Sequence, residues 1–263
     1  AVIILFGNHE IWNMETHSGS EPMGTVDDHA SILGPIIDEA VGSTKWPDQF
    51  IHYNGFRKRE DQMASRWAAY EPGGILAKPL TSKFKVAVTV GRTLCVHAGL
   101  TQTMLNKFGS IEEMNNLARK WALGFDEVDN PIGNLDFQNN LGDYKTEEDA
   151  QNAAYLRSCS LKNATPPFLQ DGPTPVSFRG LVRGLSTSRK DDLLECLHTL
   201  ETDRIVFGHT IQQVIEPTFD EKIWCIDIGM SRFLFNRSPQ VLQVEMREGK
   251  EIPSILGEDP YNY

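Results

Sequence analysis

The sequence predicts a mixed α/β fold, of the α+β type, in which helices flank a β-sheet. Short runs rich in β-branched residues, such as AVIILF at 1–6 and RIVF at 204–207, are typical of buried strands. Longer stretches with apolar residues at helical spacing, such as 188–203, lie between these runs. The 263 residues suffice for a sizeable core, and we expect a single domain over 1–263.

The predicted elements alternate along the chain, and glycine, proline and polar residues separate them. Residues 125–175 begin with a polar, turn-rich stretch, so we expect an insertion or cap region within the domain there. In chain order, we expect a strand at 1–6, helices at 27–41 and 56–70, a hairpin of strands at 85–90 and 93–98, helices at 101–124, 145–159 and 188–203, and strands at 204–210, 222–231 and 240–246.

The composition excludes several classes of protein. A formal net charge of −11 without a block of Lys or Arg argues against a nucleic-acid partner. No apolar run approaches the ~20 residues that a membrane-spanning helix needs, so we expect a soluble protein without a membrane partner. Residue 1 begins no signal-peptide pattern, and nothing in the sequence specifies an oligomeric state. Four widely spaced cysteines favour buried thiols in a reducing compartment such as the cytoplasm: Cys95, Cys159, Cys196 and Cys225.

Three of the predicted strands lead into a small residue and a histidine. Asn8 and His9 follow the first run, His97 follows the second strand of the hairpin, and His209 follows RIVF. The carboxyl ends of strands gather at one edge of a sheet, so we expect these loops to converge. Neutral imidazole and an asparagine oxygen suit a transition metal, which makes Asn8, His97 and His209 candidate ligands. A lone histidine after a strand is usually structural, and we expect that role for the others: His17, His29, His52 and His198.

Four motifs carry a family resemblance: GNHE at 7–10, VHAGL at 96–100, GHT at 208–210 and DIGMS at 227–231. In content and order they resemble the calcineurin-like metallophosphoesterases of the phosphoprotein phosphatase superfamily. GNHEIWNM and DGPTPVSFRGL make the chain most similar to the Shewanella-like protein phosphatases, over most of its length. The resemblance implies a calcineurin-like metallophosphoesterase β-sandwich flanked by helices. Its first β-α-β portion would lie outside the sequence.

The resemblance also implies a role for each matching residue. Asn8, His97 and His209 match ligands of the second of two divalent metal ions (Mn, Fe or Zn), and His9 matches the general acid. Arg179 matches an arginine that clamps the substrate phosphate, although a surface salt bridge is the alternative. The implied protein is a metal-dependent phosphomonoesterase that hydrolyses phosphoserine, phosphothreonine or phosphotyrosine in a phosphoprotein or phosphopeptide. The nucleophile would be a hydroxide that bridges the metals.

Other observations bear on this implied activity. Asp227 has two interpretations, contact with a ligating histidine or capping of a strand end. The family's GDxHG and GDxxDRG motifs, which precede GNHE, have no counterpart in the sequence. Their carboxylates make a pair of cations tolerable. We therefore expect the chain alone to bind at most one metal weakly and to have negligible phosphatase activity.

Two other functions remain open, and one is excluded. A phosphoesterase acting on nucleotides or dinucleoside polyphosphates shares the GNHE and GHT motifs. A non-catalytic pseudophosphatase that binds partners is the other alternative. A cysteine-based tyrosine phosphatase is excluded, because no cysteine has an arginine at the Cys-x5-Arg spacing; Cys225 to Arg232 is one residue too long. Without a preceding strand, 1–6 should expose apolar surface and favour aggregation.

Overall fold

The computed structural model describes residues 2–15, 72–74, 77, 81–125, 163–182, 185–230 and 234–257. The helices predicted at 27–41, 56–70 and 145–159, and most of the predicted insertion at 125–175, lie outside these residues. Within the described part of the chain, no helix is both long and apolar enough to cross a membrane.

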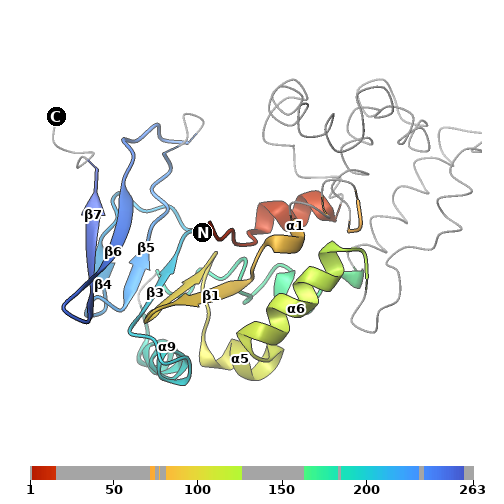
Figure 1. The fold of residues 1–263 in the computed structure, drawn as a ribbon, viewed down its shortest axis with the longest axis horizontal. Coiled ribbons are helices and arrows are strands. Elements are labelled where there is room, and N and C mark those ends of the chain that lie inside the picture. The colour runs from red at the N-terminus through yellow and green to blue at the C-terminus, as the bar shows by residue number, and fades with distance from the viewer. Residues whose placement is uncertain are drawn as a thin grey trace, which may run out of the picture.

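A five-stranded sheet forms the centre of the described structure (Figure 1). Its strand order is β1-β2-β3-β5-β4, and β3 is buried along its whole length. The strands are β1 (Ala87–Val90), β2 (Thr93–Val96), β3 (Arg204–Phe207), β4 (Pro217–Thr218) and β5 (Ile223–Cys225). The strands at 85–90, 93–98, 204–210 and 222–231 are therefore confirmed in shorter form, and Gly91 turns the predicted hairpin at a φ of 57°.

The central strands run in one direction. β2 pairs with β3 and β3 pairs with β5 in parallel, whereas β1 and β4 are antiparallel to their neighbours. The carboxyl ends of β2, β3 and β5 therefore lie at the same edge of the sheet. This is the edge at which the sequence predicts the site.

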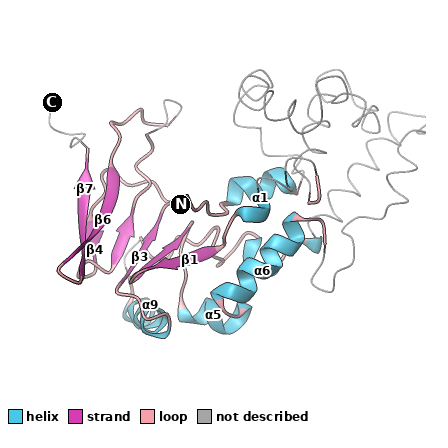
Figure 2. Cartoon of the chain, viewed as in Figure 1, coloured by secondary structure: helices cyan, strands magenta, loops and turns pink. Residues whose placement is uncertain are grey.

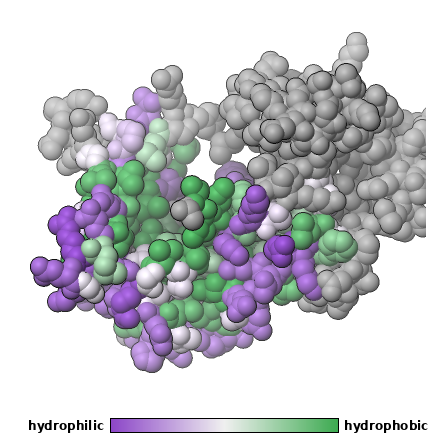
Figure 3. Space-filling model, viewed as in Figure 1, coloured by the Kyte–Doolittle hydropathy of each residue, from purple (hydrophilic) through white to green (hydrophobic). Residues whose placement is uncertain are grey.

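The first apolar run adds only a short bridge to this structure. Leu5 forms a parallel bridge with Lys85, and Phe6 N donates to Lys85 O at 2.8 Å. Such a run is typical of a strand buried on both faces, but without a preceding strand it was expected to expose apolar surface, and that expectation is confirmed. Val2, Ile3 and Ile4 are 90%, 50% and 49% exposed, because no described element covers them. Figure 3 shows hydrophobic surface on this face of the molecule, reaching from the N-terminal segment toward β6 and β7.

The helices cover one side of the sheet (Figure 2). They are α1 (Asn8–Met14), α5 (Gln102–Phe108), α6 (Ile111–Ala122) and α9 (Thr187–Thr199), with 3-10 turns η2 (Thr81–Lys83) and η3 (Pro167–Leu169). The predicted helix at 101–124 is two helices, because Gly109 turns the chain at a φ of 91° and Ser110 starts α6. Ser110 and Glu113 form a capping box there.

Apolar side chains fill both sides of the sheet. The main core lies on the helical side and includes Leu94, Phe207 and Trp121, each at most 1% exposed. On the other side, Val206 and Trp224 belong to a smaller cluster, with Ile215 and Ile228. Leu242 of β6 (Val241–Arg247) packs against this cluster. Three described cysteines are free thiols: Cys95 (partly buried), Cys196 and Cys225 (both buried).

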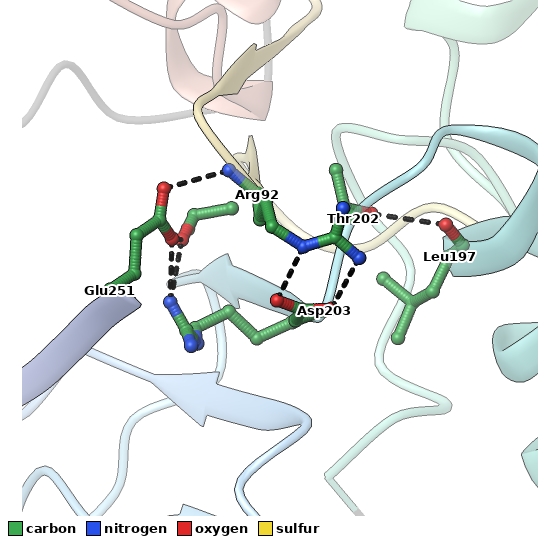
Figure 4. Close-up of polar contacts among 7 residues, drawn as sticks. Arg92, Leu197, Thr202, Asp203 and Glu251 are labelled. Carbon is green, nitrogen blue, oxygen red and sulfur yellow. Dashed lines mark hydrogen bonds and ion pairs between the residues drawn. The ribbon is translucent and has the colours of Figure 1, made fainter. Parts of the chain in front are cut away.

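The strand β6 pairs with β7 (Lys250–Leu256) in a separate two-stranded sheet. Part of β6 was predicted at 240–246, whereas β7 was not predicted. A polar cluster joins β7 to the larger sheet (Figure 4). In it, Glu251 accepts hydrogen bonds from Arg204 Nη1 (2.7 Å), Thr93 Oγ1 (3.0 Å) and Arg92 N (2.7 Å). The Arg204 and Glu251 side chains are only 10% and 8% exposed.

Candidate functional site

Asn8 is the first residue of α1, and the helix fixes its position. Glu10 Oε2 accepts a hydrogen bond from Gly7 N at 2.9 Å, which satisfies a backbone donor at the start of the helix. Ile11 and Met14, each 1% exposed, anchor the same helix in the core. The sequence predicts a loop here, but Asn8 and His9 are the first residues of a helix. The helix can start at this point because the Glu10 carboxylate caps the free N–H group of Gly7.

Asn8, His97 and His209 converge at the edge of the sheet. Asn8 Oδ1 lies 3.1 Å from His97 Nε2 and 3.1 Å from His209 Nδ1. The two imidazole rings have centroids 5.1 Å apart. Asn8 is 4% exposed, while both histidines are partly buried. These residues are more than 80 positions apart along the chain, so the fold alone brings them together.

The backbone holds this trio closely. A Cβ atom on Gly7 would lie 2.8 Å from His97 Cε1, so only glycine lets α1 approach the imidazole. Gly208 N donates to His97 O at 2.8 Å, which joins the loops after β2 and β3. His209 has a φ of 62°, a left-handed conformation that is unusual for a residue with a side chain.

Both histidines are held in the neutral form. The pKa of His97 is lowered to about 4, chiefly by burial and also by the charges of His209, His9 and Arg179. The pKa of His209 is also lowered, mostly by burial and next by the charge of Arg179. A hydrogen bond with the Ser177 backbone acts in the opposite direction and raises it. Metal ions bind the neutral imidazole, so neither ring would need to lose a proton to coordinate one.

The trio provides two imidazole nitrogens and one amide oxygen, and none of these atoms is charged. Across the described residues, no group of three or more His, Cys, Asp or Glu side chains is arranged to hold a metal ion. No carboxylate therefore joins His97 and His209 as a third ligand in this part of the chain. Three neutral donors that meet within hydrogen-bond distance fit a single divalent ion, whereas a pair of ions needs carboxylates.

Arg179 lies against the loop that carries His209. Arg179 Nη1 donates to His209 O at 2.8 Å and to Thr210 Oγ1 at 3.3 Å. Its partners here are a carbonyl and a hydroxyl rather than a carboxylate, and the residue is exposed. The guanidinium is therefore oriented beside the trio, where its planar fork suits a phosphate oxygen pair.

His9 and Asp227 both lie close enough to His209 that the charge of each affects its pKa. His9 is exposed, and its ring lies 4.9 Å from that of Trp12, at an interplanar angle of 68°. Asp227 Oδ1 accepts a hydrogen bond from Gly229 N at 3.1 Å. Of the two interpretations of Asp227, this bond fits the capping of a strand end. Asp227 also raises the pKa of His209 through its charge, although stronger effects lower it overall.

Several residues around the trio were not predicted from the sequence. Trp12 Nε1 donates to Asp171 Oδ1 at 3.3 Å, and Thr210 accepts from Arg179. Ser177 contacts His209 through its backbone. Asp171 and Ser177 belong to DGPTPVSFRGL, whose glycine and prolines indicate a loop, but that pattern does not specify which segments the loop contacts.

The fold resembles that of solved phosphatases. A cold-active protein tyrosine phosphatase superposes with a TM-score of 0.50 and 15% identity, over 100% of this chain and 59% of that chain. A cold-active protein tyrosine phosphatase from a psychrophilic Shewanella species gives a TM-score of 0.48 at 15% identity, over 97% of this chain and 58% of that chain. At this identity the superposition at 0.50 indicates the mixed α/β fold alone.

In sequence the chain is similar to a Shewanella-like protein phosphatase. This relative is Shewanella-like protein phosphatase 2 of Arabidopsis thaliana, which is 26% identical over 267 residues. The match covers 95% of this chain, and the chain spans 59% of the length of that relative. No protein-family model matches the chain.

Proposed function

We propose that this chain carries the Asn-His-His part of the catalytic site of a metal-dependent phosphomonoesterase that acts on phosphoproteins. The observation that supports this proposal is the convergence of Asn8, His97 and His209 at 3.1 Å contacts, beside Arg179. The homology to protein phosphatases favours a phosphoprotein over a nucleotide as substrate. In this proposal the two sheets form the calcineurin-like β-sandwich, which the first β-α-β portion of the family fold would complete.

Each residue has a defined part in the proposed reaction. Asn8, His97 and His209 would hold a divalent ion, which supplies Lewis acidity to the phosphoryl group and activates water. Arg179 would bind phosphoryl oxygens through N–H groups other than the bond from Nη1 to His209 O. His9, exposed at the start of α1, would donate its proton to the leaving oxygen.

The metal site is tested first by binding. We expect the chain to bind at most one Mn²⁺, weakly, as measured by electron paramagnetic resonance of free Mn²⁺ during titration. Asn8→Ala, His97→Ala and His209→Ala should each weaken this binding at least about 10-fold. The matched control is His198→Ala on α9, which changes an exposed histidine away from the trio and should leave the affinity unchanged. Equal effects of His97→Ala and His198→Ala would refute the assignment.

Hydrolysis is tested on three substrates: a phosphopeptide, p-nitrophenyl phosphate and a nucleoside triphosphate. With three neutral ligands alone, we expect negligible turnover of all three by this chain. Robust manganese-dependent turnover would contradict that expectation, and the preferred substrate would then separate a protein phosphatase from a nucleotide phosphoesterase.

A non-catalytic binding module is the second candidate. The observation that favours it is that the described residues place no third, acidic ligand beside His97 and His209. Such a module would bind a phosphopeptide through Arg179 without hydrolysing it. Isothermal titration with a phosphopeptide and its unphosphorylated form, on the wild type and on Arg179→Lys, measures this binding.

A further inference from the structure

The loop at 170–179 contacts three segments of the candidate site. Pro175 O accepts a hydrogen bond from Ala98 N at 2.9 Å, beside His97. Arg179, at the end of the loop, donates to His209 O. Asp171, at its start, accepts from the indole of Trp12 on α1. One loop therefore connects the helix that carries His9 with the arginine beside the trio.

Internal hydrogen bonds make this loop a defined structure. Thr174 Oγ1 donates to Gln170 O at 2.7 Å, and Ser177 Oγ donates to Gly172 O at 2.9 Å. Gly172 N in turn donates to Ser177 Oγ at 3.0 Å. These hydrogen bonds fix the backbone of the loop, so the Asp171 carboxylate projects from a defined turn and not from an extended surface segment.

Trp12 is the next part of this connection. It lies one helical turn after His9, where side chains three positions apart meet. The two rings are 4.9 Å apart in a T-shaped arrangement, a preferred geometry for aromatic pairs. Because Trp12 Nε1 is bound to Asp171 Oδ1 at 3.3 Å, rotation of the indole about its own side-chain bonds is restricted.

We propose that Trp12 is a positioning residue for His9, and that Asp171 fixes the orientation of the indole. The position of Asp171 is set by the same loop that presents Arg179. The loop therefore fixes the position of His9, the proposed proton donor, relative to Arg179, the proposed phosphate-binding residue. The contacts that carry this inference are independent of any metal, whereas its catalytic consequence depends on the proposed function.

The first test uses the metal-free chain. In a chain with labelled histidines, the ring protons of His9, assigned with His9→Gln, should show chemical shifts displaced by the indole ring current. Trp12→Leu should return them to the values of an exposed histidine, and Asp171→Ala should move them part of the way. Asp171→Asn keeps an oxygen acceptor and should leave them unchanged. Shifts that are identical in the wild type and Trp12→Leu would overturn the proposal.

Folding is controlled separately from positioning. Glu195→Ala removes an exposed carboxylate on α9 and should leave the His9 shifts unchanged. Trp12→Phe keeps an aromatic ring but loses the indole N–H, so the His9 shifts should remain displaced while becoming insensitive to Asp171→Ala. Backbone amide shifts of β2 and β3 should be constant throughout the series, and a global change in them would assign a merely structural role to Trp12.

The second test uses the chain loaded with Mn²⁺. An alkyl phosphate needs a proton on its leaving oxygen, whereas p-nitrophenolate departs as a stable anion. If turnover is measurable, Asp171→Ala should lower kcat about 10-fold on the alkyl phosphate and leave kcat on p-nitrophenyl phosphate nearly unchanged. Equal losses on both substrates would overturn the positioning role. If the wild type hydrolyses neither substrate, as its three neutral ligands lead us to expect, the His9 shifts alone decide the positioning.

Discussion

The buried ion pair between Arg204 and Glu251 gives the sharpest stability prediction (Figure 4). Removal of Glu251 leaves the Arg204 guanidinium buried without its counter-ion, and it also removes acceptors from Thr93 Oγ1 and Arg92 N. Loss of one partner of a buried pair costs about 3–5 kcal/mol. We therefore expect Glu251→Ala to lower the free energy of unfolding by about 4 kcal/mol. Glu251→Gln, which keeps one oxygen acceptor, should lower it by about 2–3 kcal/mol.

Urea unfolding followed by circular dichroism measures these losses. With an m-value of about 2–3 kcal/mol/M, a loss of about 4 kcal/mol moves the midpoint by about 1.3–2 M. Asp203→Asn is the matched control, because it also removes a carboxylate paired with an arginine. The Arg92 and Asp203 side chains are 58% and 47% exposed, so water screens that pair. Its loss should be several-fold smaller.

One result of the comparison between the Glu251 and Asp203 variants would refute this reasoning. If Glu251→Gln and Asp203→Asn lower the midpoint equally, burial of the Glu251 pair contributes nothing, and the reasoning fails. A double variant, Arg204→Leu with Glu251→Leu, removes both charges together. Because no unpaired charge then remains, it should lose less stability than Glu251→Ala alone.

Three further predictions follow from the structure. Hydrogen bonds lower the pKa of Glu251 below its ordinary value of 4.5 although burial opposes them, so its stabilisation should be complete above about pH 5. The difference in unfolding free energy between wild type and Glu251→Gln should therefore shrink as the pH falls through the lowered pKa; a constant difference from pH 7 to 3 would contradict this. Gly7→Ala should push its new Cβ against His97 and weaken Mn²⁺ binding about 10-fold, while Gly249→Ala, in the open turn before β7, should not. Replacing the exposed Val2 and Ile3 with Thr should reduce aggregation, measured by light scattering, with a change in unfolding free energy within about 0.5 kcal/mol.

The strands that could be predicted from the sequence are the ones whose signal is local. Runs such as RIVF at 204–207 are apolar on both faces, because β3 lies between β2 and β5. The strand β7 carries no such signal, since KEIPSIL contains Pro253 and mixes charged and apolar residues. Its position depends on the contact of Glu251 with residues far away in the chain. Such a contact leaves no local pattern.

The candidate site divides in the same way. Each ligand candidate follows an apolar strand or run, so the convergence of Asn8, His97 and His209 could be predicted from the general behaviour of parallel sheets. The contact between Trp12 and Asp171 spans 159 positions and was not predicted. A long-range hydrogen bond between two side chains follows no periodicity or spacing rule, and only the folded structure reveals it.

The two-stranded sheet of β6 and β7 shares no backbone ladder with the five-stranded sheet among the described strands. Side chains attach it to the larger sheet. Leu242 packs on the apolar cluster, and Glu251 accepts hydrogen bonds in the polar cluster. Gln240 Oε1 accepts a hydrogen bond from Ile215 N at 2.9 Å. The hairpin is therefore held to the larger sheet by side-chain contacts. Its turn at 248–249 is exposed, with nothing within 4 Å of a Cβ on Gly249. A reporter peptide or fluorophore inserted there would leave the His97 and His209 loops intact. This turn is therefore a suitable labelling site for binding experiments.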